Sequence, residues 1–334
     1  ALLKSAQFPT HGWRKLVVET PTPVSALLHA GLLNAGPFLM VRFSHLMIES
    51  TSASLLLLIF GGLTALFASA VYLTQPSIKV SLGYSSMAHM GFSLLLCGLG
   101  LYSAAILHVV GHSFYKAHSF LSSGSVIDAL KSQKILSPER KGNPFLIILS
   151  ICSALTLFFL CSYLWGFNFN DFSLMIIGAI IIMGISQFLV QTLDSKGSLK
   201  NVLLSVIISC LVAFSFFGFE HSARWLLNSE IPFLTAPDKL IQFAALALLI
   251  IYSAAILIQL FSYRLVNSKS AYKLGIHLRN GFYTNVIFDK MIGSLEHDKF
   301  KWANLSVREE LEEEKIKNIN QKSILQQAEA LINS

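Results

Sequence analysis

Three ionisable side chains recur at four-residue intervals in the stretch His108-Val-Val-Gly-His112-Ser-Phe-Tyr-Lys116. On an α-helix this spacing places the three side chains on one face, with about 6 Å of rise between successive members. That step is too long for a direct hydrogen bond, but one water molecule can bridge it. Imidazole takes up and releases a proton near neutral pH, and a lysine in a low dielectric can also lose its proton. The spacing is therefore typical of a proton relay.

Two other interpretations of this row stay open. The side chains could form a structural hydrogen-bond network, or the HxxxH pair could bind a metal ion. A metal site needs a third ligand, and the sequence offers no cysteine or carboxylate nearby. The position of Lys116 in the membrane favours the relay. Its Cα lies about 6 Å from the midplane of its predicted span, and the membrane interface is about 9 Å further away. That distance exceeds comfortable snorkelling, so we expect Lys116 to face a wet or polar interior.

Further ionisable residues lie in the first half of the chain. Lys4 stands just before Pro9, where freed carbonyl groups and water could surround it. His29 follows two prolines that give a rigid start to its helix. A single histidine at this position is more often a satisfied core residue, so the residues alone leave the role of His29 open. We predict Lys4 and His29 as additional members of the relay from the family resemblance that their surrounding motifs carry. The residues that we interpret as accessory or structural are Glu19, His89 and His118.

The composition shows in which environment these residues must lie. Of 334 residues, 54% are hydrophobic and only 13% are charged, and the mean hydropathy is +0.61. A soluble domain carries about 25% charged residues. The net charge of +7 is spread over short loops and a tail, without a basic patch interleaved with aromatic residues. We therefore expect a lipid bilayer and no nucleic acid as the surroundings of this chain.

Long apolar stretches predict an all-α, polytopic transmembrane helix bundle with a broken helix near the N-terminus. The eight complete candidate spans are residues 22–42, 51–74, 81–100, 102–123, 144–165, 172–192, 201–219 and 240–262. A ninth segment, 1–13, begins in mid-pattern and looks truncated, so we expect the chain to be the C-terminal part of a longer protein. The last four spans hold no ionisable residue beyond their edges, which is typical of a scaffold.

These spans imply two parts, a transmembrane proton-conducting domain at 1–262 and a cytoplasmic tail at 263–334 that includes a predicted helix at 306–333. Basic residues gather in alternate connections, including 126–143 and the start of the tail, and the positive-inside rule places these in the cytoplasm. We expect a multi-pass protein of the cell (inner) membrane. The cysteines lack metal-ligand spacing and are predicted to be small buried residues. They are Cys97, Cys152, Cys161 and Cys210.

Several stretches resemble the antiporter-like subunits of respiratory complex I and of multisubunit sodium/proton antiporters. They are KSAQFP (4–9), ETPTPVSALLHA (19–30) and the row from His108 to Lys116 with FLSSGS (120–125). The resemblance implies a proton-carrying lysine at Lys4, a histidine at His29 and a central relay at His108, His112 and Lys116. Four sequence stretches are more specifically similar to the DabB group, the membrane subunits of energy-coupled inorganic carbon pumps. These stretches are FPTHGW (8–13), HAGLLNAG (29–36), YSSMAHMG (84–91) and YKAHSFLSSG (115–124).

This resemblance implies a transporter subunit rather than an enzyme. The subunit would pass protons down their gradient and drive a soluble zinc-containing, carbonic-anhydrase-like partner on the cytoplasmic face, which hydrates CO2. The zinc belongs to the partner, and no cofactor is expected in this chain. The alternatives are a proton-pumping subunit of an NADH-quinone oxidoreductase-type complex or of a cation/proton antiporter, and a scaffold for a partner's chemistry. The span 144–165 lacks the lysine or glutamate that complex I relatives carry after the central relay.

The predicted orientation can be tested by cysteine labelling in an otherwise cysteine-free protein. A cysteine at Lys134 should react with impermeant reagents only after the cells are opened, because its loop is predicted to be cytoplasmic. A cysteine at Asn168 should react in intact cells. The opposite pattern would overturn both the orientation and the number of spans.

Overall fold

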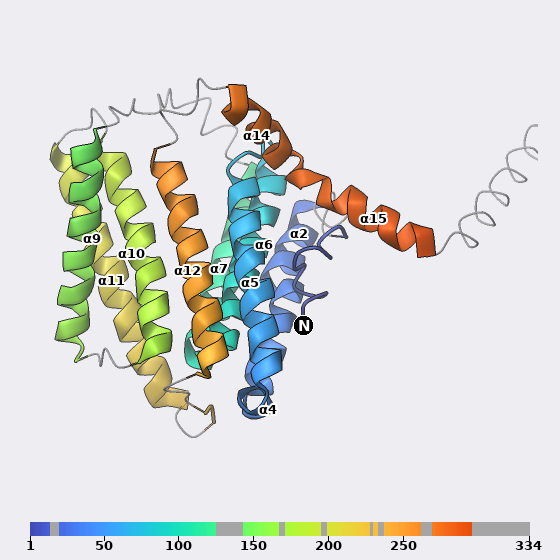
Figure 1. Cartoon of the computed structure of the whole chain (residues 1–334), viewed down its shortest axis with the longest axis horizontal. Coiled ribbons are helices and arrows are strands. Elements are labelled where there is room, and N and C mark those ends of the chain that lie inside the picture. Colours follow the sequence, from blue (N-terminus) through green and yellow to red (C-terminus); the bar gives the residue numbers. More distant parts are fainter. Residues whose placement is uncertain are drawn as a thin grey trace, which may run out of the picture. The chain divides into compact units, whose positions relative to one another are not determined.

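The computed structural model of the chain describes residues 1–13, 20–124, 143–166, 171–194, 199–227, 230–232, 237–261 and 269–295 (Figure 1). Every regular element in these ranges is a helix, which confirms the predicted all-α polytopic bundle. Several sequence predictions fall outside the described residues. They concern Glu19, Lys134, Asn168, most of the loop 126–143 and the tail helix 306–333.

Long helices joined by short connections make up most of the chain. They are α5 (Thr51–Tyr72), α6 (Ile78–Gly98), α7 (Tyr102–Leu121), α9 (Pro144–Leu164), α10 (Phe172–Leu193), α11 (Leu199–Leu227) and α12 (Lys239–Leu260). The shorter elements are α2 (Thr22–Ala30), η1 (Leu32–Asn34), α3 (Ala35–Arg42), α4 (Ser44–Glu49), η2 (Ser122–Gly124), α14 (Lys269–Arg279), η3 (Gly281–Tyr283) and α15 (Thr284–Leu295). The chain forms two compact units, Ala1–Phe282 and Tyr283–Ser334. The predicted domain boundary near residue 262 stays a prediction.

Seven stretches of the described residues are long and apolar enough to cross a membrane, which makes this a multi-pass membrane protein. They are Thr22–Arg42, Thr51–Tyr72, Ile78–Gly98, Pro144–Leu164, Phe172–Leu193, Lys200–Leu227 and Lys239–Leu260. The first of them is not one helix but α2, η1 and α3 in succession. The one predicted span that is missing from these seven is 102–123, which corresponds to α7. This helix has 20 residues but is less apolar because it carries three histidines and a lysine. Residues 1–13 form turns.

The helix α11 extends further than the sequence predicts. The predicted end at residue 219 is wrong, because the helix continues through Glu220 and Arg224 to Leu227. The two charges can stay in the helix since Arg224 Nε donates a hydrogen bond to Glu220 Oε1, one turn away, at 2.8 Å. The second half of the bundle therefore does carry ionisable residues within a long helix.

The four cysteines differ in their surroundings. Cys97 and Cys161 are buried as predicted, whereas Cys210 is half-buried and Cys152 is exposed. The prediction for Cys152 is wrong because this residue lies on a face of α9 that no described helix covers. In a bilayer such a face is surrounded by lipid, so an apolar run in the sequence does not require burial in protein.

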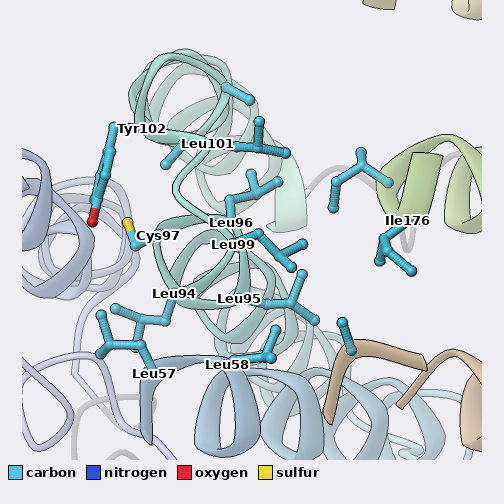
Figure 2. Packing of buried hydrophobic residues seen from close by; sticks show 14 of the residues in the cluster. Leu57, Leu58, Leu94, Leu95, Leu96, Cys97, Leu99, Leu101, Tyr102 and Ile176 are labelled. Carbon is cyan, nitrogen blue, oxygen red and sulfur yellow. The ribbon is translucent and has the colours of Figure 1, made fainter. Parts of the chain in front are cut away.

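Contact between α5 and α6 is the most extensive in the bundle, and glycines make it close. A Cβ atom added at Gly61 would lie 2.6 Å from the Gly91 carbonyl oxygen, and one at Gly98 would lie 2.6 Å from the Leu58 backbone nitrogen. Small residues let helix backbones approach in this way in membranes. Figure 2 shows the leucines beside this contact, among them Leu57, Leu58 and Leu94 to Leu96, all buried.

The close contact predicts that Gly91→Ala destabilises the protein. The new methyl group would meet backbone atoms of Ala65 and Gly61 at 2.7 Å, which can move only if α5 and α6 separate. We expect a cost of about 1–3 kcal/mol, measured as a lower thermal unfolding midpoint in detergent. The matched control is Gly184→Ala on α10, where a methyl group meets nothing within 4 Å. Equal melting of the two variants would contradict the prediction.

Candidate functional site

The candidate site is the row of polar side chains that α7 presents to its neighbours. This helix packs against α2, α3, α6 and α11. Lys116 is fully buried, His112 is nearly so, and His108 is half-buried. From His108 to Lys116 the row covers about 12 Å of the helix axis. Groups that could exchange protons thus line one interior face of α7 over a substantial part of a bilayer's thickness.

His89 on α6 completes this row from the facing helix. Its Nδ1 lies 3.3 Å from His108 Nε2, and its ring centroid lies 5.3 Å from that of His112. The rings of His108 and His112 are themselves 6.5 Å apart and nearly parallel. His89 therefore lies beside both rings, and two histidines that the spacing predicts to need a bridging water share a third imidazole as a neighbour. The sequence prediction treated His89 as accessory, whereas its position is within the cluster.

Asn34 fixes the orientation of the His112 ring. Asn34 Nδ2 donates hydrogen bonds to the Ala30 carbonyl oxygen at 2.5 Å and to Ser113 Oγ at 2.6 Å, which defines the orientation of the amide. Its Oδ1 lies 3.2 Å from His112 Nδ1 and can only accept, so Nδ1 of His112 carries a proton. His112 Nε2 is buried and has no hydrogen-bond partner among the described residues. This nitrogen is therefore placed to accept a proton.

Lys116 is the most buried residue of the row, and its polar contacts are weak. Its Nζ donates a hydrogen bond to the Leu82 carbonyl oxygen at 3.3 Å and lies 5.2 Å from the ring centroid of Tyr115. Within the described part of the chain no carboxylate forms an ion pair with it. A fixed carboxylate would hold a proton permanently on the amine.

The remaining predicted residues lie at different distances from the row. His29 on α2 is buried and stacks on Phe120 of α7, with ring centroids 4.6 Å apart. It thus lies one helical turn beyond Lys116 along α7. Lys4 and His118 are exposed. Within the described ranges, no group of three His, Cys, Asp or Glu side chains is arranged to hold a metal ion.

Sequence reasoning missed Asn34 as a member of the site. The stretch HAGLLNAG (29–36) contains it, but nothing in its spacing indicates that Asn34 faces α7. Its role follows from the break between α2 and α3, since η1 ends at Asn34 and turns this side chain towards Ser113 and His112.

Residues 1–193 match the family described as "NADH:quinone oxidoreductase/Mrp antiporter, TM". Two relatives have names that refer to carbon transport. "Probable inorganic carbon transporter subunit DabB2" of Halothiobacillus neapolitanus is 40% identical over 209 residues, 63% of this chain and 33% of that protein. "Probable inorganic carbon transporter subunit DabB" of Hydrogenovibrio crunogenus is 48% identical over 135 residues, 40% of this chain and 26% of that protein.

A relative with a different name matches more of the chain at lower identity. "NADH-ubiquinone oxidoreductase chain 5" of Metridium senile is 32% identical over 235 residues, which cover 68% of this chain and 39% of that protein. The chain therefore spans well under half the length of each of these three relatives.

The geometry predicts that His89 matters as much as His112. We expect His89→Ala to lower proton flux across membrane vesicles at least about tenfold, because it removes the imidazole between His108 and His112. His118→Ala is the matched control and should keep most of the flux, since His118 lies about 200° around α7 from Lys116 and is exposed. Similar flux in both variants would show that His89 is not part of the route. A pH-sensitive dye inside the vesicles measures the rate.

Proposed function

The chain belongs to the NADH:quinone oxidoreductase/Mrp antiporter family of transmembrane proteins, and we propose that it is the proton-conducting membrane subunit of an inorganic carbon pump. The observation that carries proton conduction is the row of Lys116, His112, His89 and His108, in which Lys116 and His112 are buried and His89 lies against both other histidines. Ionisable groups at such depth cost several kcal/mol and are retained mainly where they serve transport.

The proton route that we propose follows the hydrogen-bonding capacity of each group. Lys116 would give a proton to Nε2 of His112, because Nδ1 of that ring is already bonded to Asn34. The resulting imidazolium would pass the proton from the same nitrogen to His89. The short contact between His89 Nδ1 and His108 Nε2 would carry it on to His108. Each transfer moves one proton, in either direction along the gradient. Before the next cycle Lys116 would take up a new proton, and His89, which receives a proton at Nε2 and gives one from Nδ1, would return to its starting tautomer.

The relatives named as inorganic carbon transporter subunits support the carbon pump over other members of the family. Over 135 residues each, the DabB protein of Hydrogenovibrio crunogenus is 48% identical to this chain, against 42% for the NADH-ubiquinone oxidoreductase chain 5 of Chondrus crispus. In the proposed assembly this chain passes protons, and a soluble zinc-containing, carbonic-anhydrase-like subunit on the cytoplasmic face hydrates CO2 to bicarbonate. The zinc would reside in that partner. In the same proposal the C-terminal tail of this chain lies in the cytoplasm.

A second candidate function is a proton-pumping subunit of a redox complex or of a cation/proton antiporter. The similarity to NADH-ubiquinone oxidoreductase chain 5 favours it, because that alignment covers 68% of this chain against 63% for the DabB2 protein. Purification of the protein with its natural partners separates the two candidates. Flavin or iron–sulfur subunits in the complex would favour the redox assembly.

Lys116→Ala should abolish proton flux while the protein remains in the membrane. The substitution removes the only lysine on α7, and the neighbouring Leu82 carbonyl cannot replace a group that binds and releases protons. The matched control is Lys200→Ala, which removes an exposed lysine at the start of α11. Flux is measured at equal protein abundance. Wild-type flux in Lys116→Ala would refute the relay.

The carbon pump predicts a requirement for two subunits. The protein together with its zinc-containing partner should restore growth in air to a host that lacks carbonic anhydrase, and neither should suffice alone. One lacks the hydration chemistry and the other lacks the energy source. An uncoupler should abolish bicarbonate accumulation in the rescued cells. Rescue that persists with Lys116→Ala would count against the carbon pump and leave the second candidate.

A further inference from the structure

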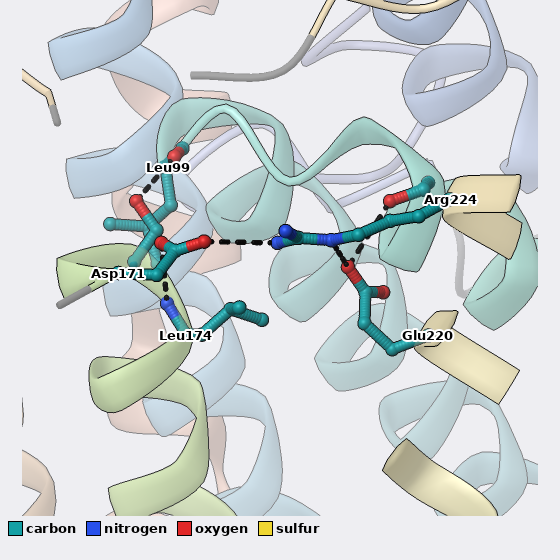
Figure 3. A network of polar contacts seen from close by, with 7 residues as sticks. Leu99, Asp171, Leu174, Glu220 and Arg224 are labelled. Atoms are coloured by element: carbon teal, nitrogen blue, oxygen red, sulfur yellow. Dashed lines mark hydrogen bonds and ion pairs between the residues drawn. The ribbon is translucent and has the colours of Figure 1, made fainter. Parts of the chain in front are cut away.

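A second cluster of charged side chains lies at the end of the bundle where α6 joins α7 (Figure 3). Glu220 Oε1 on α11 accepts hydrogen bonds from Arg224 Nε at 2.8 Å and from Ser103 Oγ of α7 at 3.3 Å. Arg224 Nη2 also forms an ion pair with Asp171 at 3.1 Å. The side chain of Glu220 is 1% exposed, that of Asp171 12% and that of Arg224 32%. The cluster thus leads from a buried carboxylate to a partly exposed guanidinium.

The second carboxylate oxygen of Glu220 is not explained by this ion pair. Glu220 Oε2 is buried and has no hydrogen-bond partner among the described residues. A carboxylate that only stabilised the fold would be expected to have both oxygens bonded, because an unpaired buried charge is costly. The unpaired oxygen indicates a further partner, such as water or a transferable proton.

A cavity of about 330 Å³ connects Glu220 with the row on α7. Helices α6, α7, α10 and α11 form its walls, and the residues that line it include both His108 and Glu220. These two are the only ionisable side chains among the described residues of its lining, and the rest is apolar, for example Phe92, Ile177 and Phe216. The volume exceeds that of several water molecules, and two polar ends provide the hydrogen-bonding partners that ordered water needs.

The separation between the two groups suits a short chain of water. Ser103, whose hydroxyl donates to Glu220 Oε1, lies five residues before His108 on α7, an axial rise of about 7.5 Å and a turn of about 140° around the helix. Water in the cavity would bridge this separation.

We infer that Glu220 is a further proton-carrying residue, which continues the route from His108 through the cavity to the membrane surface beside Arg224 and Asp171. This inference rests on the proposed proton conduction. A proton leaving the His108 imidazolium forms an O–H bond at Oε2 of Glu220 by way of the intervening water. When that bond breaks, the proton passes to water at the surface. The positive charge of Arg224 then stabilises the carboxylate that remains.

Substitution of Glu220 by glutamine tests this role in the complete protein in its native membranes. Glu220→Gln keeps the size of the side chain and an acceptor for Ser103 and Arg224, but an amide cannot carry a proton. We expect proton flux to fall at least about tenfold, with protein abundance and thermal stability near wild type. The matched control is Glu49→Gln, an exposed glutamate on α4, which should conduct as wild type.

Comparison with Lys116→Ala separates the two proposals. If Lys116→Ala keeps wild-type flux, the proposed function fails. If Lys116→Ala loses flux while Glu220→Gln keeps it, proton conduction stands and the role of Glu220 is overturned. Loss in both variants with Glu49→Gln unaffected supports the inference.

Labelling with dicyclohexylcarbodiimide gives a readout that does not depend on transport or on a folded variant. This hydrophobic reagent adds to protonated carboxyl groups in apolar surroundings and leaves a stable N-acylurea that peptide mass spectrometry locates. We expect modification of Glu220 in wild-type membranes, faster at lower pH, and none at Glu49. A carboxylate locked permanently in its ion pair with Arg224 would stay unmodified at every pH at which the protein is folded, and that result would overturn the inference.

Discussion

Hydrocarbon offers no hydrogen bonds, so the ionisable groups in the row from His108 to Lys116 depend on partners from neighbouring helices. Asn34 provides the partner for His112, the Leu82 carbonyl provides one for Lys116, and His89 provides one for His108. These contacts come from two segments of the chain, since Asn34 ends η1 and both Leu82 and His89 lie on α6. They hold the row in one geometry and leave His112 Nε2 without a hydrogen-bond partner among the described residues, as the proposed relay requires.

The packing of α5 on α6 determines where His89 lies. Gly91, two residues further along α6, touches the backbone of α5 so closely that it leaves no space for a methyl group. This contact fixes α6 along its axis and in rotation, and with it the face that carries His89. A shift of α6 by even one residue would turn His89 by about 100° away from α7. A backbone contact without any chemistry of its own thus positions a central imidazole of the site.

The two halves of the bundle differ in how they handle charge. Around α7 the histidines and the lysine lie close together without a carboxylate among their described contacts, which suits groups that gain and lose protons in turn. On α11 the charges are paired, since Arg224 bonds both Glu220 and Asp171. This pairing lets α11 continue eight residues beyond the predicted span. The cavity between His108 and Glu220 joins these two arrangements.

The sequence by itself determined the membrane class, the helical fold and the row of His108, His112 and Lys116. Those features depend on local periodicity and on apolar length, both of which are readable within about twenty residues. Only the tertiary structure decided the roles of Asn34, His89 and Glu220. Asn34 lies 78 residues from His112, and Glu220 lies 117 residues from Ser103, so each meets its partner through helix packing that no local pattern encodes. The end of α11 also involves a partner outside the helix, because Asp171 forms a second ion pair with Arg224.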